Sequence, residues 1–280
     1  MLSVLKNTKE GMITYYVGDN PDHVKHLSKC TLYCKEDFRP SLNDCKIINV
    51  KDPQLEFYKI SKNYKEDYLE EDRHIGGSYY SIHPQAKIGK NVKIGRGCVI
   101  GNCIIEDNCI IHPNVIIYSK TKIGKNTIIE ANSVIGATGV MWVWDGDERI
   151  YLEQLGGVEI EPNCMIGSNI TIVRGSANEK TLIGEGTCMA HGTLIGHGCQ
   201  IGKKNHFANN VSLGGGCHTA EKCFFGSGVV LSPGAKLLNE CLIGAGGVVI
   251  GTIKKSGVYV GMPAKWKKEI KGKLNGVPLQ

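Results

Sequence analysis

An aliphatic residue recurs at every sixth position along most of this chain. Ten consecutive isoleucines between residues 82 and 135 keep the spacing, with one five-residue step from Ile100 to Ile105. Fifteen further positions keep it within 160–172 and 183–249, where Met, Phe, Leu, Thr or Val sometimes replaces Ile. Four residues after each of these positions the side chain is usually small. Each six-residue unit therefore alternates one large and one small inward position.

A six-residue period favours a parallel β-helix. An α-helix with about 3.6 residues per turn cannot keep such a stripe on one face, and a β-hairpin has no reason to repeat at this interval. In a β-helix each unit supplies one short strand and one turn, three units close a triangular coil, and coils stack about 4.8 Å apart. We therefore predict an all-β dominated fold in which about eight coils enclose one continuous core.

The period also sets the expected domain boundaries. Residues 1–80 lack it and are predicted to form a small α/β domain, with a polar Gly-containing linker at 66–81. The β-helix is expected over 81–251. Residues 252–280 hold seven lysines against one acid, which predicts a short Lys-rich helix or tail that is either solvated or a counter-charge for a polyanionic ligand.

Two interruptions of the period are expected to leave the coils as loops, at 138–158 and 174–181. The first contains Trp142, Trp144 and Tyr151. Exposing several aromatic side chains is unfavourable unless they contact something, so we expect this loop to line a subunit interface or a ligand.

Composition narrows the function classes. The net charge of +6 is a mild excess and does not indicate a nucleic-acid partner. The N-terminal residues show no signal-peptide pattern, and no stretch reaches the roughly 18 apolar residues of a membrane span, so a cytoplasmic protein is expected. Seven of the twelve cysteines occupy small inward positions and are expected to be reduced core filler: 98, 109, 164, 199, 217, 223 and 241.

Stacking the predicted coils brings candidate catalytic residues together. Three units make eighteen residues, so Gly215 should lie one coil above His197, and Arg174 one coil below once the second interruption is counted. An imidazole beside a bare backbone N–H suits a general base next to an oxyanion donor. His191 falls on a different edge, so His191 and His197 cannot chelate one metal within one chain, and no metal site is predicted.

The periodicity resembles the left-handed β-helix superfamily of hexapeptide acyltransferases. Four segments are similar to the N-acyltransferase that acylates UDP-3-O-acyl-glucosamine in the lipid A pathway. They are GMITYYVGDNPDHVKHL at 11–27, VIGATG at 134–139, TIVRGSANEKTLIG at 171–184 and IGHGCQIGKKNHFANNVSLGG at 195–215. The resemblance covers nearly the entire chain and implies a left-handed β-helix and a homotrimer with sites between neighbouring subunits.

The resemblance also implies roles for individual residues. His197 falls on the general base of the family and Gly215 on its oxyanion N–H. Tyr15 and His23 fall on positions that stack with the nucleobase, and Asn20 on the amide that reads it. Apart from the resemblance, two further residues at the turns are expected to contact the substrate or its phosphate: Arg174 and His191.

The C-terminal segment points to the acyl donor. GMPAK, which begins at Gly261, resembles the ending of acyltransferases that use coenzyme A. Lysines near it match the adenosine phosphates of that cofactor. The residues expected to contact acyl-coenzyme A are Gly214, Gly216, Lys236, Lys254 and Lys265.

These observations lead to the hypothesis of an N-acyltransferase that moves an acyl group from acyl-coenzyme A to the amine of a nucleotide-linked sugar, without a tightly bound cofactor. The first alternative is the lipid A N-acyltransferase itself, which uses acyl carrier protein as donor. A γ-carbonic-anhydrase-like metalloenzyme is a second alternative, although the chain lacks the His-x4-His spacing that is typical of those enzymes. A non-catalytic module that senses a nucleotide sugar is a third.

Overall fold

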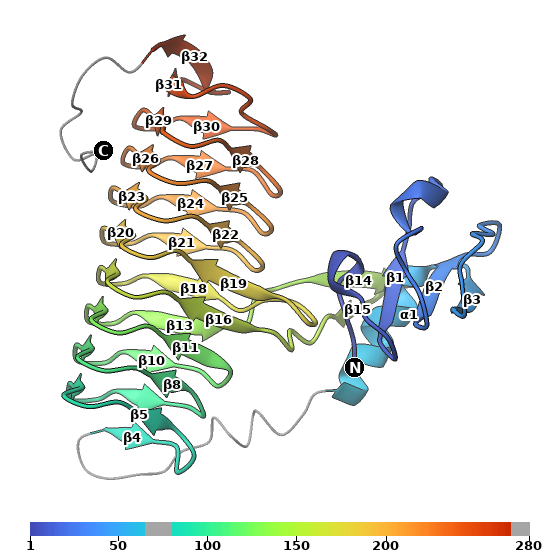
Figure 1. Ribbon diagram of the computed structural model, residues 1–280, viewed down its shortest axis with the longest axis horizontal. Helices are drawn as coiled ribbons and strands as arrows, with labels where there is room; N and C mark the ends of the chain where they lie inside the picture. The colour runs from blue at the N-terminus through green and yellow to red at the C-terminus, as the bar shows by residue number, and fades with distance from the viewer. Residues whose placement is uncertain (65–79, 270–280) are drawn as a thin grey trace. The chain divides into compact units, whose positions relative to one another are not determined.

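The computed structural model of this protein describes residues 1–64 and 80–269. They form two compact units (Figure 1). The first contains the N-terminal residues together with 139–156 and 175–179, and the second contains the remaining described residues. The two interruptions of the six-residue period thus supply chain to the first unit. Most of the predicted linker at 66–81 lies outside the described residues.

The first unit is built on a small parallel sheet with strand order β1-β2-β3, whose strands are β1 (Ile13–Tyr16), β2 (Thr31–Lys35) and β3 (Lys46–Val50). Helix α1 (Pro53–Ser61) begins where the Asp52 side chain accepts the Leu55 N–H at 2.9 Å, and it buries Phe57 and Tyr58. Three short 3-10 helices complete the unit: η1 (Leu5–Asn7), η2 (Pro21–His23) and η3 (Lys62–Tyr64). This is the small α/β arrangement that the sequence predicts.

The aromatic loop is an antiparallel hairpin of β14 (Trp142–Asp145) and β15 (Glu148–Tyr151) in the first unit. One face buries Ile150 against the side of α1 that holds Phe57. The opposite face leaves Trp142 and Trp144 38% and 49% exposed, with the Arg149 guanidinium 5.0 Å from each ring centre. Alternation of side chains along each strand explains why one row is buried and the other faces out.

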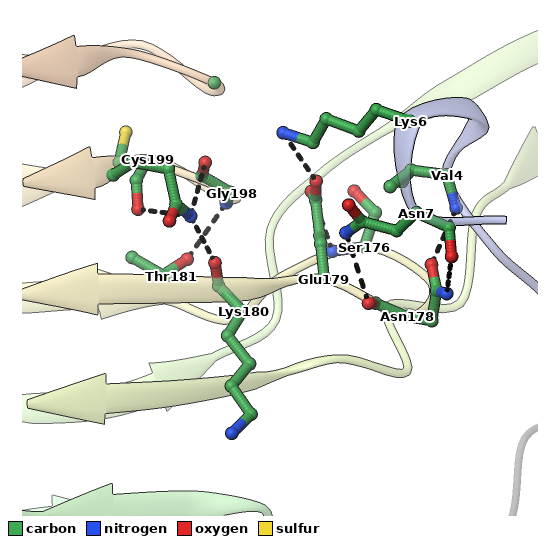
Figure 2. A network of polar contacts seen from close by, with 12 residues as sticks. Val4, Lys6, Asn7, Ser176, Asn178, Glu179, Lys180, Thr181, Gly198 and Cys199 are labelled. Carbon is green, nitrogen blue, oxygen red and sulfur yellow. Dashed lines mark hydrogen bonds and ion pairs between the residues drawn. The ribbon is translucent and has the colours of Figure 1, made fainter. Parts of the chain in front are cut away.

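The second interruption joins the N-terminal segment by polar contacts (Figure 2). The Val4 N–H donates to Asn178 Oδ1 at 2.9 Å, and Asn178 Nδ2 donates to Asn7 O at 3.0 Å. Lys6 and Glu179 form an ion pair at 3.9 Å. These contacts hold residues 175–179 within the first unit.

The second unit is a triangular solenoid of three sheets in which parallel strands stack coil upon coil (Figure 1). The nine-stranded sheet contains β4 (Ser81–Ile82), β7 (Val99–Ile100), β10 (Ile116–Ile117), β13 (Val134–Ala137), β18 (Thr171–Val173), β21 (Leu194–Ile195), β24 (Ser212–Leu213), β27 (Val230–Leu231) and β30 (Val248–Val249). The eight-stranded sheet contains β5 (Lys87–Ile88), β8 (Ile104–Ile105), β11 (Thr121–Ile123), β16 (Gly157–Ile160), β19 (Lys180–Ile183), β22 (Gln200–Ile201), β25 (His218–Thr219) and β28 (Lys236–Leu237). The ten-stranded sheet contains β6 (Lys93–Ile94), β9 (Ile110–Ile111), β12 (Ile128–Ile129), β17 (Met165–Ile166), β20 (Cys188–Met189), β23 (His206–Phe207), β26 (Phe224–Phe225), β29 (Cys241–Ile243), β31 (Gly257–Val260) and β32 (Lys265–Lys268).

The periodic aliphatic residues form the core, as predicted. Each pairs with its equivalent one coil away, for example Ile117 with Ile135 and Ile195 with Leu213. The seven inward cysteines are buried and are free thiols. The sheets contain about nine coils, slightly more than the expected eight.

The corners of the coils use left-handed backbone conformations, which favour Gly and Asn because these residues adopt positive φ at low cost. On the edge between the eight- and ten-stranded sheets, Asn91, Asn108, Asn126 and Asn163 have φ between 57° and 62°. Their side-chain amides form a continuous ladder, in which Asn108 donates to Asn126 at 3.3 Å and Asn126 donates to Asn163 at 3.0 Å. The ladder thus ties successive corners together.

The prediction of a Lys-rich helix after residue 252 is wrong for the part of the segment that the structure describes. Residues there form β31 and β32, which are antiparallel to each other. Strand β31 pairs with β29 and buries Val258 and Tyr259, so it covers the open edge of the last coil. Residues 270–280, including Lys271 and Lys273, lie outside the described residues.

The asparagine ladder predicts a graded loss of stability. Asn126→Ala removes two side-chain hydrogen bonds and places a Cβ-bearing residue without a compensating amide at φ 58°. Left-handed backbone costs such a residue about 1–2 kcal/mol, so we expect a clear fall in the free energy of unfolding measured with denaturant. Asn126→Gly removes the same bonds without the backbone strain and should lose less. Equal losses for both variants would contradict the role of the left-handed corner.

Candidate active site

His197 and Gly215 lie on one edge of the solenoid, between the nine- and eight-stranded sheets. His197 is the second residue after β21, and Gly215 is the second after β24. These strands pair in the register Leu194 with Ser212 and Ile195 with Leu213. The alignment predicted by adding eighteen residues is therefore present at the level of the backbone.

The imidazole of His197 packs directly on the backbone of Gly215. A Cβ built on Gly215 would lie 2.6 Å from Cδ2 and 2.7 Å from Cε1 of the His197 ring, and Nε2 would be its closest neighbour. Such distances are far shorter than ordinary van der Waals contacts, so a side chain at 215 excludes the present position of the ring. The absence of a side chain at Gly215 is what brings imidazole and backbone amide together.

The N–H of Gly215 is not used by the solenoid ladder. Its neighbours are used, since Gly214 donates to Leu231 O at 2.9 Å and Gly216 donates to His197 O at 2.7 Å. Among the described residues, no hydrogen bond is made by the Gly215 N–H itself. An uncommitted backbone N–H beside an imidazole can donate to a developing oxyanion.

The sequence of the next coil explains why this N–H stays open. At equivalent corners the backbone N–H of the second residue after the strand donates to a side chain from the coil above. Examples are Lys90 to Asp107 Oδ1 at 2.6 Å, Ser168 to His191 Nδ1 at 3.0 Å and Glu221 to Asn239 Oδ1 at 2.9 Å. The residue in that place above Gly215 is Pro233, whose side chain has no acceptor.

His191 lies on a different edge, between the ten- and nine-stranded sheets, as predicted from its spacing. Its Nδ1 accepts the Ser168 backbone N–H at 3.0 Å and lies 2.7 Å from Ser168 Oγ. Because a backbone N–H can only donate, neutral His191 has its proton on Nε2. In that form the outward nitrogen of His191 is neither a base nor a metal ligand.

Arg174 has the predicted backbone register but not the predicted role. Its side chain is fully buried, with Nε donating to Gly136 O at 3.0 Å and Nη2 donating to Ser119 O at 2.7 Å. The guanidinium also lies 6.0 Å from the centre of the Tyr118 ring. The expectation that Arg174 steers a phosphate is therefore corrected: the side chain turns into the protein and satisfies carbonyl groups there.

The predicted nucleotide residues in the first unit do not form one cluster. Tyr15 lies on the α1 side of the sheet, with its ring centre 4.9 Å from that of Phe57, and burial raises the pKa of its hydroxyl. Asn20 and His23 lie in the following loop, where Asn20 Oδ1 accepts the Asp22 N–H at 2.9 Å. Tyr15 is thus a packing residue of the small domain rather than a partner of these two.

Tyr16, which the sequence reasoning passed over, is the aromatic residue that meets them. Its hydroxyl lies 2.9 Å from His23 Nδ1 and donates to Asn20 O at 3.1 Å. Side chains alternate along β1, so adjacent tyrosines must point to opposite faces of the sheet. The alternation of side chains along the strand, rather than the motif alone, would have identified Tyr16 as the tyrosine that faces this loop.

The predicted coenzyme-binding residues are spread along the upper part of the solenoid. Gly214 packs so closely against Pro233 that no side chain would fit at 214, whereas Gly216 has φ 69° with open space around it. Lys236 and Lys254 are exposed near one end of the eight-stranded sheet, where Ile253 donates to Lys236 O at 2.7 Å. Lys265 is exposed on β32, in the ten-stranded sheet.

Neither a metal cluster nor a membrane-spanning helix is present in the described part of the chain. Within 1–64 and 80–269, no three His, Cys, Asp or Glu side chains lie close enough to hold a metal ion. None of the helices in those ranges has the length and apolar character required to cross a membrane.

Comparison with known proteins finds a family model that matches part of the solenoid. The family model described as Bacterial transferase hexapeptide (six repeats) matches residues 102–137. The matched segment lies within the solenoid and covers part of its six-residue repeats. No curated protein matches its sequence.

Solved structures extend the similarity over about two thirds of the chain. LpxA from Bacteroides fragilis, a UDP-N-acetylglucosamine acyltransferase, is 24% identical with a TM-score of 0.61 over 69% of this chain and 74% of that chain. Another UDP-N-acetylglucosamine acyltransferase is 25% identical (TM-score 0.60, 67% of this chain and 72% of that chain). LpxA from Acinetobacter baumannii is 26% identical (TM-score 0.60, 67% and 71%). These similarities confirm the predicted left-handed β-helix and the predicted resemblance to hexapeptide acyltransferases.

The contact between Gly215 and His197 predicts an energetic coupling. Gly215→Ala should lower the free energy of unfolding by about 1–3 kcal/mol, the usual cost of overpacking, because its methyl group overlaps the imidazole. In a His197→Ala background the same substitution should cost less, since the three nearest atoms to the new Cβ all belong to that ring. A double-mutant cycle measured by chemical denaturation tests this. Additive losses would mean that the ring does not pack on Gly215 in solution.

Proposed function

We propose that this protein is an acyltransferase that acts on a nucleotide-linked sugar, with His197 as general base and the Gly215 N–H as oxyanion donor. The match to the hexapeptide transferase family model and the similarity to a UDP-N-acetylglucosamine acyltransferase support the reaction class. The observation on which the site assignment rests is the imidazole of His197 packed beside the open N–H of Gly215.

In the proposed reaction an amine of the sugar attacks the carbonyl carbon of an acyl thioester. The His197 imidazole takes the proton that the nitrogen loses, while the carbonyl oxygen gains negative charge and accepts the Gly215 N–H. Collapse of the tetrahedral intermediate breaks the C–S bond. The leaving thiolate takes the proton from the imidazolium, which releases the amide and the free thiol.

Acyl-coenzyme A is the proposed donor. Exposed lysines at the end of the solenoid, Lys236, Lys254 and Lys265, can pair with its phosphates, and Gly216 leaves open space at the same edge as Gly215. An acyl carrier protein is the alternative donor. Turnover with each thioester, measured by release of free thiol, separates the two.

Oxygen rather than nitrogen is the second candidate acceptor. One similar structure is named for UDP-N-acetylglucosamine, a sugar whose nitrogen is already acylated, so its remaining nucleophiles are hydroxyl groups. His197 and Gly215 would have the same roles toward a hydroxyl. Mass analysis of the product before and after hydroxylamine decides the question, because an ester is cleaved under conditions that leave an amide intact.

The nucleotide is proposed to bind the first unit beside Asn20 and His23. Both side chains are exposed, and the Tyr16 hydroxyl holds the loop on which they lie. Binding the nucleotide there would restrain the attached sugar, and restraint of a reactant removes part of the entropic cost of a bimolecular reaction.

A homotrimer is proposed from the outward residues of the three sheets. The nine-stranded sheet presents mainly aliphatic side chains: Val99, Ile116, Val134, Leu194, Val230 and Val248. The ten-stranded sheet presents Ile110, Ile128, Met165, Phe224 and Leu242 among its residues. The eight-stranded sheet instead presents Lys87, Lys122, Glu159, Gln200, His218 and Lys236 among its residues. Two apolar faces and one charged face suit a ring in which unlike apolar faces meet around a three-fold axis.

Removal of the proposed base gives the main test of function. His197→Ala should lower kcat by about 100-fold or more, because general-base catalysis usually contributes that much. His26→Ala removes an exposed histidine outside the proposed site and should leave turnover unchanged. Product formation followed by mass spectrometry measures both. Wild-type turnover in the His197 variant would show that another group accepts the proton.

Matched substitutions test the trimer. Ile116→Asp places a charge on the apolar nine-stranded face and should yield monomers by light scattering, because burying that carboxylate in an interface is costly. Ile104→Asp makes the same change on the eight-stranded face, where Ile104 is exposed, and should leave the trimer intact. A wild-type monomer, or dissociation by both variants, would contradict the proposed faces.

A further inference from the structure

The turn that bears His197 stands above a break in the solenoid. Strand β18 ends at Val173, the chain then leaves for residues 175–179, and it returns in β19 at Lys180. At this edge the regular coils join corner to corner through the backbone, as where Gly216 donates to His197 O at 2.7 Å and Gly234 donates to Gly215 O at 2.9 Å. By the same spacing, the N–H of Gly198 would meet the carbonyl of Arg174.

Gly198 instead donates its N–H to the side chain of Thr181, at 2.9 Å from Oγ1 (Figure 2). The same hydroxyl donates to Val173 O at 2.6 Å. Thr181 is fully buried, and its bond to the Gly198 N–H is buried, whereas its bond to the Val173 carbonyl is partly buried. One side chain thus replaces the backbone contact that the break removes.

A second side chain holds the far end of the same turn. Gln200 Nε2 donates to Lys180 O at 2.7 Å and to Cys199 O at 3.1 Å. Thr181 and Gln200 together connect the turn at 196–199 to both strands that border the break. Gln200 Nε2 also donates to Gly198 O at 3.3 Å, but that contact is partly buried, whereas the contact of Thr181 with the Gly198 N–H is buried.

We propose that Thr181 is a positioning residue for His197, which acts by fixing the turn through the Gly198 N–H. The inference rests on the proposed function, in which His197 is the general base. Without the hydroxyl, the buried N–H of Gly198 and the partly buried carbonyl of Val173 lose this partner, and the turn must shift to satisfy the N–H again. The imidazole would move with the turn away from Gly215, and a misplacement of about 1 Å at a reacting group can cost about 100-fold in rate.

Thr187 provides a matched control for a purely structural role. It is also fully buried, and its Oγ1 donates to Gly202 O at 3.2 Å and accepts the Asn205 N–H at 3.3 Å. These contacts join a different edge of the solenoid, between the eight- and ten-stranded sheets. Thr187→Val therefore removes the same kind of buried hydroxyl without touching the turn of His197.

The test compares Thr181→Val, Thr181→Ser and Thr187→Val in the full-length protein. We expect Thr181→Val to lower kcat by about tenfold or more with KM for both substrates little changed, and Thr181→Ser to restore most of the rate. Thr187→Val should lose similar stability and keep kcat. The inference is overturned if both Val variants have equal kcat, or if Thr181→Ser fails to restore it.

An activity-independent measurement separates this inference from the proposed function. The ring resonances of His197, assigned by their loss in His197→Ala, should shift in Thr181→Val and stay in place in Thr187→Val. If His197→Ala retains full turnover, the base assignment is wrong, and these resonances alone decide whether Thr181 positions the ring. If His197→Ala is inactive while Thr181→Val retains kcat and unshifted resonances, only the inference about Thr181 is wrong.

Discussion

Closure of an eighteen-residue coil around inward aliphatic side chains is the constraint on which the rest of the solenoid depends. Each coil must place three large residues in the centre and turn three corners between them, so each position is stacked on its equivalent in the coil below. The corners require residues that accept positive φ, which explains the Asn and Gly found there. Small inward residues such as Thr and Cys then fill the space beside the aliphatic stack.

The same constraint produces the candidate site. Because residues eighteen apart are neighbours, the lack of a side chain at Gly215 determines where the His197 ring can lie. It also places that ring beside the Gly215 N–H. A larger residue would displace the imidazole, and an acceptor in place of Pro233 would occupy the amide, as at the other corners. The site is therefore a place where the usual side-chain contacts between coils are missing, next to a group that can accept a proton.

The sequence predicted backbone positions in the solenoid well and side-chain directions poorly. Periodicity was sufficient to place His197 beside Gly215, because the register of stacked coils follows from counting residues. The same counting put Arg174 on that edge, yet its side chain turns inward to the carbonyl groups of Gly136 and Ser119. In the first unit, motif similarity selected Tyr15, whereas strand alternation assigns Tyr15 to the packing against α1 and Tyr16 to the loop. The strands after residue 252 were missed because their pairing depends on the open edge of the last coil, which no local pattern reveals.

A crystal structure with a non-reactive ketone analogue of acyl-coenzyme A, in which a methylene group replaces the thioester sulfur, would test the central claim most directly. The account predicts the carbonyl oxygen of the analogue within hydrogen-bond distance of the Gly215 N–H, about 3 Å, with the reacting carbon beside the His197 imidazole. An analogue bound at the lysines of the upper coils with its carbonyl turned away from Gly215, or bound on another edge of the solenoid, would contradict it.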